Sequence, residues 1–186
     1  KNGKSTMLAG LLLYLLLADD EPGAEIYCCA SSRDQAAIVG DACRDMIRGN
    51  ADLAGMVEVQ RNTIRYQASK LEILSSDAPT KHGRNPSAIV FDELHTFDEN
   101  GRELHATMSS GMGMRTQPLK IAITTAGHNR TSLAYELHTH AEKVRDGIIE
   151  DYQFLPVLYG APIDADWTSP KVWRAANPSL GVTVTE

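Results

Sequence analysis

The sequence is short of the features that mark membrane proteins and metal-binding cysteine clusters. Its longest apolar run is twelve residues, from Met7 to Ala18, whereas a membrane-spanning helix needs about 20. It has three cysteines, Cys28, Cys29 and Cys43, and their spacing does not match a zinc site. We therefore expect no transmembrane segment and no cysteine-bound metal. Adjacent cysteines in an apolar run are typical of the core of a reduced, cytosolic protein.

Positive charge is also scarce. The 186 residues include 18 Lys and Arg against 24 Asp and Glu, which gives a net charge of −6. This balance argues against nucleic-acid binding over the whole surface, but it leaves room for a local basic rim. Repeats and low-complexity segments are absent as well. The length and the 42% hydrophobic fraction indicate one globular domain with a substantial core.

The first twenty residues, KNGKSTMLAGLLLYLLLADD, fit two interpretations. A basic start and an apolar run resemble a secretory signal, but the acidic DDEPGAE that follows offers no small-residue cleavage site. Alternatively, Gly3, Lys4 and Ser5 are the last positions of a phosphate-binding loop, G-x-x-x-x-G-K-[ST]. Its first glycine would precede residue 1, and without an initiator methionine we expect that residue 1 is not the native start.

The second interpretation assigns a role to each residue of this stretch. Backbone N–H groups at a helix start bind anions, and Gly3 lets the backbone approach a phosphate. Lys4 would contact the β- and γ-phosphates, and the Ser5 hydroxyl would bind Mg²⁺. The expected ATP-binding residues are Asn2, Gly3, Lys4, Ser5 and Thr6.

Strands and helices are predicted to alternate along the chain. Residues 24–31, 87–95 and 119–127 read as buried strands, 152–160 as an edge strand and 62–76 as a hairpin; 32–49, 101–113 and 132–147 read as helices. Ser32 is the expected N-cap of the first of these helices, and Gly147 ends the last. Residues 77–86 and the chain from Ala161 onward read as loop. This order is typical of an α/β fold with a mostly parallel sheet flanked by helices, here a P-loop NTPase.

Two acids follow a buried strand in AIVFDELH, residues 88–95. Asp92 is placed to hold Mg²⁺, and Glu93 is placed to orient and deprotonate an attacking water. Alternatively, the strand simply runs into an acidic turn. The combination with GKST favours an ATPase over both the acidic turn and the secretory signal. His95 either positions Glu93 or packs at the surface.

The run ITTAG, residues 123–127, brings two hydroxyl groups to the end of another predicted strand. Thr124 or Thr125 would hydrogen-bond the γ-phosphate or the attacking water and sense its loss. Alternatively, the two threonines only pack within the strand.

Taken together, KNGKST, ASSRDQA, AIVFDELH, ITTAG and W-x-x-ANPSLG resemble, in this order, the large terminase subunits of tailed bacteriophages. These proteins are ATP-driven motors that load double-stranded DNA into procapsids. The resemblance covers essentially the whole chain, and ANPSLG is more specific than the ATPase motifs. It implies Walker A roles for Lys4 and Ser5, Walker B roles for Asp92 and Glu93, and a coupling role for Thr124 and Thr125.

The resemblance also implies domains and partners. Residues 1–160 would be the ATPase domain without its first strand, which leaves an unpaired slot in the sheet. Residues 161–186 would lead toward a nuclease domain that cuts DNA as an endonuclease. The expected partners are double-stranded DNA, the portal protein, the small terminase subunit and further copies of the chain in a ring. The expected location is the cytoplasm of the infected bacterium.

A neighbouring subunit in such a ring often donates an arginine to the active site, with a rate effect of about 10³–10⁵ in well-studied nucleotide hydrolases. Arg84 in KHGRNPS is the candidate, with Lys81 and Arg115 as alternatives. Arg84 as an ordinary loop cation is equally compatible with the sequence.

Two other functions fit the same residues. DELH also resembles the Walker B segment of superfamily-2 helicases, which would continue into a second RecA-like domain. A nucleotide-binding module without turnover is the second alternative, and the carboxylate of Glu93 argues against it.

Overall fold

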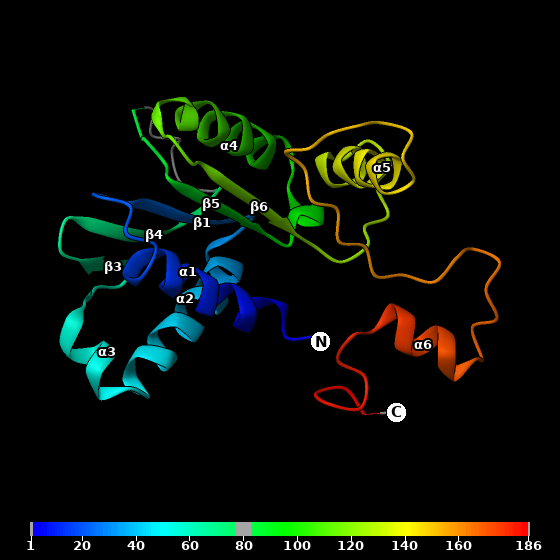
Figure 1. The fold of residues 1–186 in the computed structure, drawn as a ribbon, viewed down its shortest axis with the longest axis horizontal. Coiled ribbons are helices and arrows are strands. Elements are labelled where there is room, and N and C mark those ends of the chain that lie inside the picture. The colour runs from blue at the N-terminus through cyan, green and yellow to red at the C-terminus, as the bar shows by residue number, and fades with distance from the viewer. Residues whose placement is uncertain (1, 77–82, 186) are drawn as a thin grey trace. The chain divides into compact units, whose positions relative to one another are not determined.

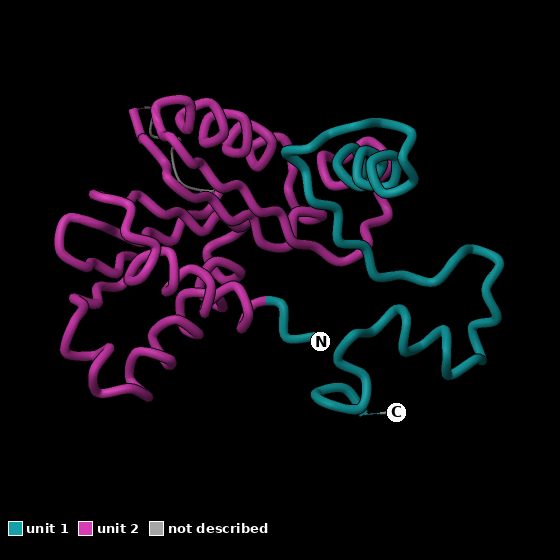
Figure 2. The backbone as a smooth tube through the Cα atoms, viewed as in Figure 1, with its two compact units in different colours: residues 1–4, 135–186 teal, residues 5–134 magenta. Residues whose placement is uncertain are grey.

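The computed structural model describes residues 2–76 and 83–185. Its chain divides into two compact units, drawn in different colours in Figure 2. The larger unit is Ser5–Ala134, and the smaller one combines Lys1–Lys4 with Tyr135–Glu186. The domain boundary after residue 160 stays a prediction.

The larger unit is built on a six-stranded sheet with the order β2-β3-β4-β1-β5-β6. Strands β4, β1, β5 and β6 are parallel, whereas β2 and β3 form antiparallel pairs on the β4 side. The strands are β1 (Glu25–Ala30), β2 (Glu58–Val59), β3 (Thr63–Tyr66), β4 (Ser69–Ser75), β5 (Ala88–Asp92) and β6 (Leu119–Ile123). This arrangement confirms the predicted mostly parallel sheet and the hairpin within 62–76.

The described residues also form helices. They are α1 (Lys4–Leu17), α2 (Arg33–Arg48), α3 (Ala51–Met56), α4 (Glu99–Ser110), α5 (Leu133–Arg145) and α6 (Pro170–Ala176), with 3₁₀ turns at Leu94–Thr96 and Gly111–Met114. Ser32 caps α2 as predicted, because its hydroxyl accepts the Gln35 N–H at 3.3 Å. Gly147 follows α5 with a φ of +70°, which suits a glycine just beyond a helix. Among the described residues, no helix is long and apolar enough to cross a membrane.

The sheet has a helical layer on each face (Figure 1). Helices α1 and α2 pack on one face, where Leu8, Leu12 and Val39 join Ile26 and Cys28 in a fully buried apolar core. Helix α4 covers the other face, where Phe91 of β5 contacts Phe97 and His105. All three cysteines are buried thiols, as predicted.

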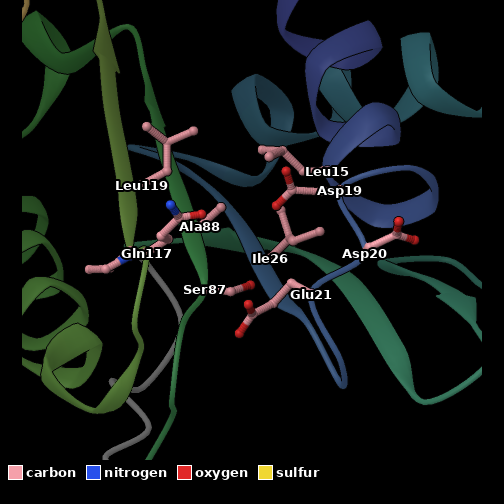
Figure 3. A pocket seen from close by; sticks show the side chains of 10 residues that line it. Leu15, Asp19, Asp20, Glu21, Ile26, Ser87, Ala88, Gln117 and Leu119 are labelled. Carbon is pink, nitrogen blue, oxygen red and sulfur yellow. The ribbon is translucent and has the colours of Figure 1, made fainter.

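The residues that line a cavity show the direction of α1 relative to the strands. The cavity has a volume of about 580 Å³, and Figure 3 shows Leu15 near the end of α1, and Asp19 just beyond it, beside Ile26, Ala88 and Leu119. These last three residues lie at the amino ends of β1, β5 and β6. Helix α1 therefore runs antiparallel to these strands, and its 14 residues span about 20 Å. Ser5 accordingly lies toward the carboxyl ends of the strands.

Three predictions about elements were wrong. Residues 152–160 form no strand in the described chain, and Pro156 has no N–H to donate to a neighbouring strand. Strand β6 ends at Ile123 and is only partly buried, because it forms the edge of the sheet. The region from 161 onward contains α6, which begins at Pro170.

Candidate functional site

Polar side chains gather where the parallel strands end. Ser31 follows β1, Glu93 follows β5, and Thr124 follows β6. The Thr96 hydroxyl donates to the Glu93 carbonyl at 2.7 Å and lies 2.7 Å from the Ser31 hydroxyl. This edge of the sheet is therefore tied together by side-chain contacts between segments that are far apart in the sequence.

Glu93 stands on an unusual backbone. Its φ of 49° and ψ of 51° lie in the left-handed region, which costs a non-glycine residue about 1–3 kcal/mol. The carboxylate Oε2 accepts the Thr125 N–H and the Thr125 hydroxyl, each at 3.3 Å. The predicted catalytic acid and the predicted coupling segment are thus in direct contact.

Asp92 is the last residue of β5 and pairs in register with Ile123 of β6. Its side chain is almost entirely buried, at 1% exposure. Mg²⁺ usually keeps several waters and takes one or two carboxylates together with phosphate oxygens. A carboxylate at the strand end and the Ser5 hydroxyl toward the same end suit that ion. Among the described residues there is no group of three or more His, Cys, Asp or Glu that could hold a metal ion.

The predicted phosphate loop leads directly into α1. Gly3 has a φ of +71°, a conformation that glycine adopts without strain, and the helix begins at Lys4. Asn2 is held by the ANPSLG run of the same unit. Its side-chain carbonyl accepts the Ser179 N–H at 3.1 Å, its backbone carbonyl accepts the Ser179 hydroxyl at 3.2 Å, and its amide donates to Asn177 at 3.4 Å.

Arg84 lies against the sheet rather than in open solvent. Its guanidinium donates to both carboxylate oxygens of Glu72, at 2.8 and 3.1 Å, and stacks 4.7 Å from the centre of the Tyr27 ring. The side chain is only 13% exposed. Burial by itself lowers the pKa of the guanidinium, but the hydrogen bonds to Glu72 and Tyr27 outweigh it and leave the pKa raised.

Arg115 and Lys81 were the alternatives to Arg84. Arg115 donates to the Asn85 carbonyl, to the Gly23 carbonyl and to the Glu21 carboxylate at 2.9 Å. These partners lie at the amino-terminal side of the sheet, away from Glu93. Lys81 lies outside the described residues.

Sequence reasoning missed the contacts that hold this edge together. Ser31 belongs to the quoted ASSRDQA run, but no role was predicted for it, and Thr96 carried no signal at all. The contact of Asn2 with Ser179 spans 177 positions, so only the fold reveals it. ANPSLG was singled out as a family signal, and the structure adds its contact with Asn2 of the predicted phosphate loop.

The fold and this edge define the class: the architecture is that of a P-loop NTPase. The family model "Terminase large subunit, ATPase domain" matches residues 1–143. The chain therefore belongs to the ATPase domain family of the large terminase subunits, as the resemblance predicted.

Relatives agree with this family. The chain is 30% identical to the large terminase subunit of Enterobacteria phage HK97 over 191 residues, which cover 97% of the chain and 36% of that protein. It is 32% identical to protein YmfN of Escherichia coli K12 over 136 residues, which cover 71% of the chain and 30% of that protein. The chain thus spans about a third of the length of these relatives.

Solved structures show the same fold. The crystal structure of the HK97 large terminase matches all of this chain, and 39% of its own, with a TM-score of 0.85 and 28% identity. The large terminase of a thermophilic bacteriophage matches 78% of this chain, and 36% of its own, with a TM-score of 0.56 and 12% identity. At that identity the second match supports the fold alone.

Proposed function

We propose that this chain hydrolyses ATP with Mg²⁺ and that the hydrolysis powers the movement of double-stranded viral DNA into a procapsid. The observation that carries the proposal is the contact between Glu93 and Thr125 at the carboxyl edge of the sheet, in a chain of this family. A carboxylate next to a hydroxyl-bearing segment at this edge suits both proton abstraction and sensing of the γ-phosphate.

The proposed chemistry assigns one task to each residue. A water oxygen attacks the γ-phosphorus, its proton passes to the Glu93 carboxylate, and the bond to the bridging oxygen breaks to release ADP. Lys4 and the N–H groups at the start of α1 neutralise phosphate charge. Asp92 and Ser5 would hold Mg²⁺, which supplies further positive charge when bound. Thr124 and Thr125 sense the loss of phosphate.

The wider function rests on the same proposal. Portal protein, small terminase subunit and further copies of the chain in a ring are the proposed partners, and the bacterial cytoplasm is the proposed location. Endonuclease activity would reside outside residues 1–186. Membership of the terminase family favours this function over that of a superfamily-2 helicase.

The test uses a longer protein that contains residues 1–186 and has about the length of the HK97 large terminase subunit. It compares ATP binding and ATP turnover of two variants with those of the wild type. Glu93→Gln should keep ATP affinity and lose turnover by about 10²–10⁴-fold, the usual contribution of a general base. Turnover above about a tenth of wild type would remove Glu93 from that role. A wild type that binds ATP without hydrolysing it would favour a binding module instead.

Lys4→Ala is the complementary variant. Its ammonium group stabilises the phosphates in both the ground state and the transition state, so ATP affinity and turnover should fall together. Calorimetric titration measures the affinity directly. Unchanged affinity would contradict the assignment of GKST as a phosphate loop.

A further inference from the structure

The imidazole of His95 stands at the centre of the contact between Glu93 and the coupling segment. Its Nδ1 lies 3.2 Å from Glu93 Oε2 and 3.0 Å from Thr124 Oγ1. It also lies 3.4 Å from Thr125 Oγ1. One ring nitrogen therefore contacts the predicted base and both predicted sensor residues.

The hydrogen bonds around this nitrogen favour one tautomer of the ring. The Thr124 hydroxyl donates its only proton to the Thr125 carbonyl at 2.8 Å and accepts the backbone N–H of His95 at 3.0 Å. The Thr125 hydroxyl donates to Glu93 Oε2 at 3.3 Å. In the tautomer that carries the proton on Nδ1, the ring donates to Thr124 Oγ1 and Glu93 Oε2, and both oxygens can accept.

Gly127 lies close to the point where the ring is attached. A Cβ atom built on Gly127 would lie 3.1 Å from the Cβ of His95, so a larger residue there would press on the ring's point of attachment. The side chain of His95 is 27% exposed and that of Glu93 is 21% exposed. A partly solvated carboxylate has several rotamers available, and a charge-assisted hydrogen bond restricts them.

We propose that His95 is a positioning residue for hydrolysis: its Nδ1–H contacts Thr124 and holds the Glu93 carboxylate beside Thr125, so that the base and the sensor segment move as one. This inference rests on the proposed ATPase function. His95 acts through Glu93, so its loss should slow turnover without weakening the binding of nucleotide.

The test uses three variants of the same longer protein. His95→Ala removes the donor, and His95→Asn places an amide N–H close to the position of Nδ1. His128→Ala is the matched control, because His128 is an exposed histidine one residue beyond Gly127. The measurements are kcat, KM for ATP and the calorimetric ATP affinity.

We expect His95→Ala to lower kcat about ten- to a hundredfold, the range for a lost hydrogen bond to a charged group. KM and ATP affinity should stay within about twofold of wild type, and His95→Asn should recover most of the rate. His128→Ala should match wild type. In a Glu93→Gln background, His95→Ala should cause no further loss, because the carboxylate it positions is gone.

Distinct outcomes separate the two proposals. A wild type without ATP turnover overturns the proposed function and this inference with it. An active wild type with an equally active His95→Ala overturns the inference alone. Equal losses in the Ala and Asn variants, accompanied by lower melting temperatures, would assign His95 a packing role instead.

Discussion

His105 is half-buried in α4 against the ring of Phe91, at 4.6 Å between ring centres. Its Nε2 is buried and makes no hydrogen bond in the described part of the chain. Burial, reinforced by the charges of Lys120 and Arg102, lowers the pKa of His105 to about 4. The folded protein therefore binds fewer protons at this site than the unfolded chain between pH 4 and 6.5.

This difference predicts a pH dependence of stability. The contribution of His105 is fully present above pH 6.5 and is lost as the pH falls toward 4, by about 2 kcal/mol after allowance for partial solvation of the ring. His105→Phe keeps an aromatic ring against Phe91 but cannot titrate. Melting temperatures between pH 4 and 7 should fall less steeply for this variant than for wild type. Equal slopes would contradict the prediction.

For individual residues, the sequence predicted which side chains belong to the candidate site better than it predicted which side chains they contact. Glu93 and Thr125 were identified because acids and hydroxyl groups after apolar strands meet at one edge of a parallel sheet. The contact of His95 with Thr124 was not predicted, because it depends on the left-handed turn at Glu93. The pairing of Arg84 with Glu72 was missed for a similar reason, since twelve residues of chain separate them.

Among the elements, the 3₁₀ turn Gly111–Met114 touches the segment that carries Arg84. A Cβ atom on Gly111 would lie 2.8 Å from the Arg84 carbonyl oxygen, whereas a Cβ on Gly113 would meet nothing within 4 Å. Gly111→Ala should therefore push on backbone and lower the free energy of unfolding by about 1–3 kcal/mol. Gly113→Ala, two residues away in the same turn, is the matched control.

Thermal melting of both variants measures the effect. We expect a clear drop in melting temperature for Gly111→Ala and little change for Gly113→Ala. A similar effect of both substitutions would show that the close approach to Arg84 is relaxed at no cost.

The elements could be predicted where periodicity and capping act locally. Helix α2 follows from its apolar spacing and Ser32, and β1 and β5 follow from uninterrupted apolar runs. Residues 152–160 have the local sequence pattern of a strand. A strand forms only when a neighbouring strand supplies hydrogen bonds, and the sequence pattern does not reveal whether one does. Helix α6 was missed because prolines on both sides of it suggested a loop, although Pro170 suits a first helical position.

For the assembled molecule, the proposed trans role of Arg84 can be tested by mixing subunits. In this structure the Arg84 guanidinium forms an ion pair with Glu72 of its own chain. This ion pair must break before Arg84 can contact ATP bound to a neighbouring subunit. Arg84→Ala subunits keep Glu93, and Glu93→Gln subunits keep Arg84. A mixed ring then contains some interfaces with both groups intact, and part of the ATPase activity should return.

Two further results bear on this prediction. A mixture as inactive as its components would place Arg84 in its own subunit's site or in a structural role. Glu72→Gln is the control for the ion pair, because it weakens the hold on the guanidinium while leaving Arg84 in place. If Arg84 acts in trans, this variant should keep its turnover.

The hydrogen bonds between Asn2 and Ser179 have a mechanical consequence. They close a loop of chain whose two ends lie 177 positions apart, so a pull applied at Ser179 reaches Asn2 without first passing through the sheet. Gly3 and Lys4 follow Asn2 immediately, and strain delivered there would tilt the amide groups proposed to face phosphate. Conversely, if the backbone amides after Asn2 shift when phosphate leaves, the shift would displace the ANPSLG run through the same hydrogen bonds. The hydrogen bonds thus join the residue before Gly3 directly to the ANPSLG run.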